Sequence, residues 1–215
     1  MPTAEESARR IESILKNNFK QIPKDENERI LDHLWKFVSN AISNDWSQKQ
    51  ICAEAARLIS RALPFTEVSL TLRVPKTKTF RYIALTGFRP DVEKVMYDTV
   101  YTEEDALGHD RDPFIRLDSF LDFELAEGET RIDQQFEHLQ YNRPTKLLEE
   151  RKAFDEMKDG DYIVLFFKSV RGELLGYVEL EAPRNRKLPQ GNVLKWLEIF
   201  GMTFGMLLQS SKKYE

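Results

Sequence analysis

The sequence DYIVLFFKSVRGELLGYVELEAP occupies residues 161–183 and decides how the rest of the chain must be arranged. Residues 161–167 are almost all β-branched or aromatic, which is typical of a strand that is buried on both faces. Gly172 can supply the positive φ angle of a turn, and residues 173–181 then resume an extended pattern. The stretch therefore predicts a β-hairpin, and the segments upstream are expected to cover it.

Alternation along the second strand predicts which side chains share a face. One face is expected to carry Leu174, Gly176, Val178 and Leu180, and the other Leu175, Tyr177 and Glu179. A polar loop between Pro183 and Pro189 ends the strand, because proline lacks the N–H that a sheet requires. Apolar residues then recur at helical spacing and predict a closing helix, namely Leu197, Phe200, Phe204 and Leu208.

Taken in order, these pieces resemble the closing signature of GAF domains. The resemblance rests on Asp161 before an apolar strand, residues 172–177 in the hairpin, Ala182-Pro183, Leu188-Pro189 and the helical residues 197–200. It is close over the last quarter of the chain, and it extends over residues 47–210 when the helix and strands upstream are included. The resemblance implies an α+β, PAS-related fold, with helices on one face of an antiparallel sheet and a variable lid region on the other.

The segments before the hairpin fit this expectation. Ser47 and Gln50 form a capping-box pattern for a helix that runs to Pro64. Residues 68–74 alternate as a strand, residues 80–86 pair with it, and Pro90 begins a short helix through residue 97. Helical patterns at residues 4–19 and 25–43 come first, so we expect an N-terminal helical extension over residues 1–46 and a GAF-like domain over residues 47–210.

Residues 99–159 are rich in charge and poor in periodicity. Residues 118–125 are compatible with a short strand, and residues 131–139 and 145–157 with helices. Glu149, Glu150, Asp155 and Glu156 lie among lysines and arginines, which favours an exposed helix with ion pairs over paired catalytic carboxylates. The resemblance implies that this region forms the lid or a pocket wall.

Composition excludes several classes of function. The 215 residues carry a formal net charge of −4 with both signs interspersed, which disfavours nucleic-acid binding. No apolar run approaches the ~18 residues that cross a bilayer, so we expect no membrane association. The single cysteine, Cys52, permits no internal disulfide and favours a cytoplasmic location.

No residue pattern predicts a metal site or a catalytic centre. Residues 109–112, His-Asp-Arg-Asp, contain metal-ligand types, but a charged loop without apolar framing is usually solvated. His138 is a haem ligand only by analogy with some GAF sensors. GAF enzymes that reduce methionine sulfoxide need several cysteines, so we expect no enzymatic activity and assign no cofactor.

The strand patterns suggest where a ligand would bind. The face away from the helices is expected to present Ser69, Thr71 and Arg73 from one strand and Tyr177 and Glu179 from the hairpin, with Tyr82, Phe120 and Phe123 as the apolar wall. Two interpretations of Arg73 and Glu179 are open, a cross-strand ion pair or contacts to a ligand. An unpaired Arg73 favours an anionic metabolite, and neutralisation by Glu179 favours a neutral one.

The resemblance implies a small-molecule-binding sensory or regulatory protein in signal transduction. We expect no output domain, so a signal would pass to a protein partner or through a homodimer. The two N-terminal helices and the small residues of the segment Gly201-Met202-Thr203-Phe204-Gly205 favour a dimer, although close packing within the chain would explain the glycines equally well. The alternative is a non-catalytic dimeric interaction or scaffold protein with a degenerate pocket.

Overall fold

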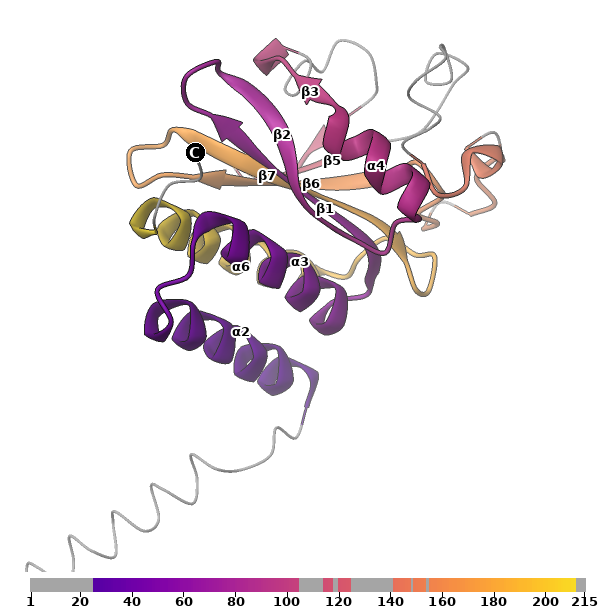
Figure 1. Ribbon diagram of the computed structural model, residues 1–215. Coiled ribbons are helices and arrows are strands. Elements are labelled where there is room, and N and C mark those ends of the chain that lie inside the picture. Colours follow the sequence, from indigo (N-terminus) through magenta and orange to yellow (C-terminus); the bar gives the residue numbers. More distant parts are fainter. Residues whose placement is uncertain are drawn as a thin grey trace, which may run out of the picture.

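The computed structural model describes residues 25–104, 114–117, 120–124, 141–147, 149–153 and 155–211. These residues form a seven-stranded sheet in the order β3-β2-β1-β7-β6-β5-β4, and every neighbouring pair is antiparallel. Helices α3 and α6 lie on one face of the sheet, α2 forms a further layer outside these two helices, and α4 lies on the other face (Figure 1). The α+β architecture expected from the sequence is therefore confirmed.

The strands differ greatly in length. The four central strands are β1 Phe65–Val74, β2 Thr79–Thr86, β6 Tyr162–Lys168 and β7 Leu174–Pro183, and the outer strands are β3 Val100–Tyr101, β4 Phe114–Arg116 and β5 Leu121–Glu124. β1 pairs with β7, so the two long hairpins are joined in the middle of the sheet. This pairing brings the residue 69 region beside the residue 179 region, although about half of the chain separates them.

The predicted C-terminal hairpin is confirmed. All five residues from Ile163 to Phe167 are buried, and Gly172 adopts a φ of 81° in the turn. The predicted alternation of side chains fails at the start of β7, because the register between β6 and β7 shifts between Phe167 and Lys168. β7 has one extra residue there, so Leu174 packs with the cluster around Tyr177, whereas Leu175 packs against the helix-side core.

The helices begin where their caps predict. α2 spans Glu26–Ser43 and is capped by Asp25, α3 spans Gln48–Ala62 behind a complete Ser47 capping box, α4 spans Pro90–Asp98, and α6 spans Gly191–Ser210. α3 and α6 lie side by side on the same face of the sheet, as the sequence predicted (Figure 1). The side-chain amide of Gln48 donates to the Leu208 carbonyl at 2.8 Å, which requires the two helices to run antiparallel.

The main core fills the layer between the sheet and helices α3 and α6 and continues between these two helices and α2. Phe204 of α6 is 1% exposed, and its ring centroid lies 5.2 Å from that of Phe37 and 5.7 Å from that of Phe167. One aromatic side chain therefore connects α2, α6 and β6. Edge-to-face ring pairs of this kind stabilise a core beyond the area they bury.

Gly201 and Gly205 serve packing within the chain. A Cβ atom on Gly205 would lie 2.4 Å from the Lys168 carbonyl oxygen, and one on Gly201 would lie 2.8 Å from Leu165 Cδ1. The small residues therefore let α6 approach β6. They do not form a surface for another chain, so the two glycines do not indicate a dimer.

The helix predicted at residues 145–157 is wrong. A single 3-10 turn, η3 Pro144–Lys146, is followed by turns and irregular backbone up to β6, with an isolated bridge between Glu156 and Lys187. Helix propensity is overridden here because charged side chains and backbone groups find partners elsewhere in the fold. The helices predicted at residues 4–19 and 131–139, and the charged loop at residues 109–112, lie outside the described residues.

α2 belongs to the same core as the sheet. Its buried residues Ile30, Leu34, Phe37 and Ala41 all pack in the helix-side cluster. Whether residues 1–46 form a separable extension stays a prediction. Among the described helices, none combines the length and the apolar character needed to cross a membrane.

Candidate functional site

The sheet face opposite α2, α3 and α6, here called the lid face, carries an unusual mixture of polar and aromatic side chains. Strand pairing aligns its central residues in rows that run across the sheet. One row contains Ser69 of β1, Glu179 of β7, Val164 of β6 and Asp122 of β5. The next row contains Tyr82, Thr71, Tyr177 and Phe166.

Glu179 is the centre of a hydrogen-bond network on this face. Its Oε2 accepts from the Ser69 hydroxyl at 2.6 Å and from the Tyr82 hydroxyl at 3.2 Å. The Tyr101 hydroxyl of β3 lies 3.4 Å from that of Tyr82. Burial, together with the negative charge of Glu179, holds the pKa of Tyr82 well above its usual value, so this hydroxyl keeps its proton.

Thr71 lies between two tyrosines in the neighbouring row. It is fully buried, and its Oγ1 has no hydrogen-bond partner within the described part of the chain. Its cross-strand neighbours are Tyr82 on one side and Tyr177 on the other. A buried hydroxyl without a partner costs about 1–3 kcal/mol, so it requires an explanation.

Aromatic rings surround these polar groups. The ring centroids of Phe80 and Tyr177 are 5.6 Å apart, and those of Tyr82 and Tyr101 are 5.7 Å apart. α4 covers one side of the face, because its residues Val92 and Met96 pack against Tyr82 together with Phe88. A polar centre with an aromatic surround is the usual composition of a small-molecule site.

Arg73 neither pairs with Glu179 nor carries a free charge for a ligand, the two possibilities that the sequence left open. One guanidinium nitrogen of Arg73 donates to Glu103 at 2.9 Å, while the strand register places Glu179 opposite Ser69. Arg73 is therefore neutralised by a residue just beyond β3. Its Nε is buried and has no partner among the described residues, so Arg73 offers one N–H group but no unbalanced charge.

One of the predicted wall residues, Phe120, does not join this site. Phe120 packs against the helix-side core and lies under the Lys168 ammonium, 5.1 Å from the ring centroid. Phe123 of β5 lies opposite Ile163 of β6 in the sheet register, and its side chain lies outside the described part. The predicted polar residues and Tyr82 and Tyr177 are brought together, and Phe80, Tyr101 and Asp122 are additions that the sequence analysis missed.

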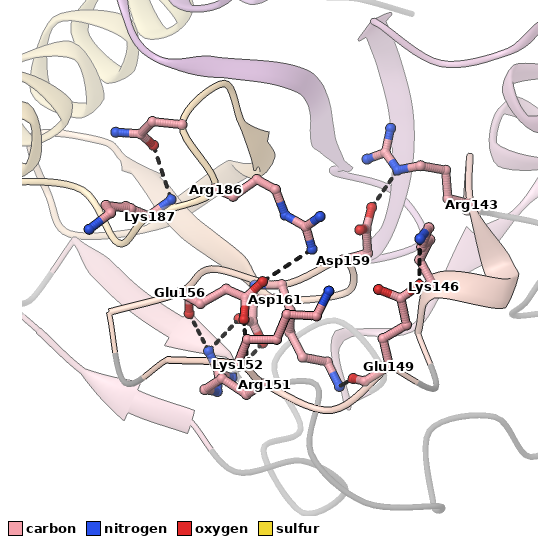
Figure 2. Close-up of polar contacts among 12 residues, drawn as sticks. Arg143, Lys146, Glu149, Arg151, Lys152, Glu156, Asp159, Asp161, Arg186 and Lys187 are labelled. Atoms are coloured by element: carbon pink, nitrogen blue, oxygen red, sulfur yellow. Dashed lines mark hydrogen bonds and ion pairs between the residues drawn. The ribbon is translucent and has the colours of Figure 1, made fainter.

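A second polar cluster anchors the chain between residues 141 and 161 (Figure 2). Asp161, which is fully buried, accepts two hydrogen bonds from the Arg151 guanidinium at 2.9 and 3.1 Å and a third from the Lys158 backbone N–H at 2.9 Å. The Arg151 guanidinium also donates to the Glu156 carbonyl. This arrangement satisfies a buried carboxylate by direct contacts, as burial of a charge requires.

The same segment is fastened to the rim of the lid face. The Asn142 side chain accepts from the Arg89 backbone N–H and donates to the Gly87 carbonyl, both at 2.8 Å. Arg143 pairs with Glu67 of β1 at 2.7 Å and also with Asp159. The start of α4 is thereby tied to the segment that precedes β6.

The residues that the structure describes contain no group of three histidine, cysteine or carboxylate side chains that could hold a metal ion. Cys52 is buried in α3, and burial raises the pKa of its thiol to about 12, which keeps it protonated. It lies in the helix layer, away from the lid face.

Comparison with known proteins identifies the fold. No protein-family model and no curated protein matches the sequence. Among solved structures, the GAF domain of a phosphoenolpyruvate-protein phosphotransferase from Acinetobacter matches with a TM-score of 0.54 at 11% identity, over 83% of this chain and 92% of that one.

Two further GAF structures match to a similar extent. The A. aeolicus nlh2 GAF domain in an inactive state has a TM-score of 0.53 at 12% identity, over 86% of this chain and 98% of that one. The GAF domain of a putative sensor histidine kinase from Pseudomonas syringae pv. tomato has a TM-score of 0.51 at 9% identity, over 85% and 87%. At such identities the likeness concerns the fold, and this chain therefore has a GAF-like fold.

Proposed function

We propose that this protein is a sensory or regulatory GAF-type domain that binds a small molecule on its lid face and does not transform it. The observation that carries this proposal is the buried Thr71 hydroxyl, which has no hydrogen-bond partner among the described residues and lies beside the Glu179 network. An interior serving stability alone gains nothing from such a group. A polar ligand would relieve the cost by supplying the missing hydrogen bond.

The remainder of the lid face supports binding without catalysis. The Ser69 hydroxyl donates directly to Glu179 at 2.6 Å, so its proton is already engaged. Activation of a serine nucleophile needs a base that is itself oriented by a third group. The described residues around Ser69 contain no histidine in that position, and we infer a binding role for the pair.

A Thr71→Val substitution tests the proposal in two ways. In the free protein it should raise the free energy of unfolding by about 1–3 kcal/mol, because a buried unsatisfied hydroxyl is removed with little change of shape. In a thermal-shift screen of metabolites it should reduce the stabilisation of a compound that binds the wild type. A ligand at a hundredfold excess over its Kd stabilises the folded state by about 2.7 kcal/mol, which such a screen detects readily.

Thr203→Val on α6 is the matched control. The Thr203 hydroxyl donates to the Ile199 carbonyl at 2.7 Å on the opposite layer, so its removal should neither raise stability nor affect ligand binding. If Thr71→Val destabilises the free protein and leaves ligand shifts unchanged, Thr71 is not part of a ligand site.

A scaffold with a degenerate pocket is the second candidate, and one observation favours it. Phe80 and Tyr177 are 0% and 4% exposed and already in ring contact, so part of the lid face is filled by its own side chains. On that interpretation Thr71→Val stabilises the protein, while no compound in the screen stabilises the wild type.

We further propose that signals pass through a homodimer formed along α2 and α6. α2 runs parallel to α6, because Asn27 accepts from the Trp196 indole at 2.9 Å and Phe37 contacts Phe204 further along. Leu31 and Trp35 follow Asn27 at intervals of four residues, so the three side chains form a stripe along one side of α2. Leu31 is 56% exposed and Trp35 is 52% exposed.

α6 adds an exposed apolar row of its own. It contains Ile199, Met202 and Met206, which are 39%, 46% and 57% exposed. The exposed apolar residues of α2 and those of α6 lie on two helices that pack against each other. A second copy of the chain would therefore cover both rows at once. Because α6 also packs directly on β6, a change on the lid face would be transmitted to this interface through one strand.

Sedimentation of the full chain and of its Trp35→Glu variant tests the dimer. The proposal requires that the full chain is a dimer. Trp35→Glu places a charge in the exposed stripe without touching the core, and it should dissociate the full chain. A full-length monomer refutes the dimer, and a dimer that survives Trp35→Glu refutes the role of α2.

A further inference from the structure

Two polar atoms of β1 on the lid face indicate which kind of atom a ligand presents there, and this inference rests on the proposed function. They are Oγ1 of Thr71 and Nε of Arg73, both buried and both without a hydrogen-bond partner among the described residues. Within that part of the chain they are the two buried side-chain atoms in this state. Residues two apart in a strand lie on the same face, so both atoms belong to one place on the sheet.

A β-bulge lies beside these two residues. The register of β1 and β2 shifts just before Thr71, and Ile83 is the extra residue of β2. Beyond the bulge, Thr71 lies opposite Tyr82 and Arg73 lies opposite Phe80. Neither neighbour serves the two atoms, because Phe80 has no polar side-chain atom and the Tyr82 hydroxyl already donates within the polar network. Bulges re-aim side chains and are frequent next to functional sites.

The chemistry of the two atoms selects an acceptor. The N–H at Nε of an arginine can only donate a hydrogen bond, whereas a threonine hydroxyl can donate or accept. A ligand atom that satisfies both groups at once must therefore be an acceptor. A carbonyl oxygen has two lone pairs and can accept from Thr71 and Arg73 together.

The charge at this place is already balanced. A terminal guanidinium nitrogen of Arg73 donates to Glu103 at 2.9 Å, and the two side chains are 28% and 48% exposed. A carboxylate on the ligand would lose its hydration without gaining an unbalanced cation. Burial of an ionised carboxylate costs much more than burial of an amide. An uncharged acceptor can use the Nε–H and leave the ion pair intact.

Aromatic rings lie beside the hydroxyl. Tyr82 and Tyr177 are the two cross-strand neighbours of Thr71. Rings of this kind pack favourably against a flat apolar group. We propose that the ligand is an uncharged amide or ketone on a flat apolar frame, whose oxygen accepts from the Thr71 hydroxyl and the Arg73 Nε–H. Glu103 is then the residue that sets the selectivity against carboxylates.

Matched small probes test this proposal on the full chain by NMR titration. Acetophenone and benzamide supply the oxygen, α-methylstyrene replaces the acetophenone oxygen by a CH2 group, and benzoate is the charged counterpart of benzamide. We expect α-methylstyrene to bind about fivefold more weakly than acetophenone, because one hydrogen-bond acceptor is lost. Benzoate should bind at least about tenfold more weakly than benzamide. The metabolite screen described above is run beside this series.

Variants locate the recognition. Arg73→Lys keeps a cation opposite Glu103 but removes Nε, and it should weaken benzamide binding about tenfold. Glu103→Gln leaves Arg73 unbalanced, and it should strengthen benzoate binding about tenfold relative to benzamide. Arg57→Lys and Glu54→Gln make the same two changes in an Arg–Glu pair on α3, in the opposite layer, and should alter no affinity. If Arg73→Lys fails to fold, the order of the four probes on the wild type still decides.

The outcomes separate this inference from the proposed function. Stronger binding of benzoate than of benzamide, or equal binding of acetophenone and α-methylstyrene, overturns the uncharged acceptor. Benzamide binding that Arg73→Lys leaves unchanged overturns it as well, and an unchanged preference in Glu103→Gln overturns the role of Glu103. In each of these cases a metabolite that stabilises the wild type keeps the proposed function. If neither the probes nor any metabolite binds, ligand binding itself is rejected, and the inference with it.

Discussion

The hairpin with its closing helix and the segment from residue 141 to residue 161 are built on opposite principles. In β6, β7 and α6 the backbone groups pair in regular ladders, and apolar side chains such as Phe167 and Phe204 fill the space between sheet and helix. In the other segment the backbone is irregular, and fully buried Asp161 is held by Arg151. One region is stabilised by area removed from water, the other by individual polar contacts.

The difference teaches what each region can tolerate. A packed apolar layer responds to lost volume and to added volume, because interiors are close-packed. An irregular segment held by ion pairs responds instead to the loss of a single partner, which leaves a buried charge uncompensated. Substitutions in the two regions should therefore lower the stability of the protein for different physical reasons.

The largest effect is expected from Phe204→Ala in the apolar region. The side chain is 1% exposed and contacts rings from α2 and β6, so its truncation should lower the free energy of unfolding by about 3–5 kcal/mol. Urea denaturation measures the loss. Asn192→Ala, at an exposed position near the start of the same helix, should change stability by less than about 0.5 kcal/mol. Equal effects at both positions would contradict the described packing of α6.

Asp161→Asn probes the polar region with almost no change in volume. It leaves Arg151, whose side chain is only 16% exposed, without its charged partner, and should cost about 3 kcal/mol. Asp155→Asn is the control, because Asp155 pairs with Lys187 at the surface, where the two side chains are 59% and 61% exposed. Surface pairs contribute at most about 1 kcal/mol. If both variants unfold at the same urea concentration, the anchoring role of Asp161 is wrong.

Added volume should also be costly in the apolar region. Gly205→Ala brings a Cβ within 2.4 Å of a β6 carbonyl oxygen, so α6 must move away from the sheet at a cost of about 1–3 kcal/mol. Gly191→Ala at the start of the same helix meets no atom within 4 Å and should be neutral or slightly stabilising. Thermal denaturation of the two variants gives the comparison. Tolerance of Gly205→Ala would mean that α6 and β6 are less closely packed than described.

The smallest effect is a local response to pH in the polar region. The Lys152 backbone N–H and the nearby Arg186 guanidinium hold the pKa of Glu156 below its usual 4.5. A lowered pKa stabilises the folded state above pH 4.5, and this stabilisation is lost as the pH falls through the folded-state value. Hydrogen exchange should therefore report loosening of residues 152–158 in acid, while the β6–β7 ladder stays protected.

Glu156→Gln is the control for the pH response. It removes the titrating group, so exchange of the segment should become faster at neutral pH and lose its dependence on acid. Acid loosening that persists unchanged in this variant would assign the response to another carboxylate.

Much of the fold was predictable because its signals are local. The alternation in β1, the apolar run in β6, the Ser47 capping box and the stripe of α6 each arise from residues close together in sequence, and each was confirmed. The site was predictable in part for the same reason. Alternation within β1 places Ser69 and Thr71 on one face, and Glu179 of β7 shares that face because the apolar side of each strand turns toward the helices.

The remaining features depend on partners that are distant in the chain. No pattern at residues 145–157 indicates that Arg151 will bind Asp161 instead of lying in a helix, since charged residues at this spacing suit an exposed helix equally well. The pairing of Arg73 with Glu103, 30 residues further on, was equally hidden. A bulge of one residue in β7 then reversed the expected faces of Leu174 and Leu175.

The sequence by itself determined the elements, their order and the sheet face on which the polar residues lie, because periodicity and capping are properties of short stretches. Only the tertiary structure decided that Tyr82 and Ser69 both donate to Glu179, that Thr71 finds no partner in the described part of the chain, and that Gly205 fits against β6. Hydrogen-bond direction and close packing depend on atoms from several strands. They arise only when the register between those strands is fixed.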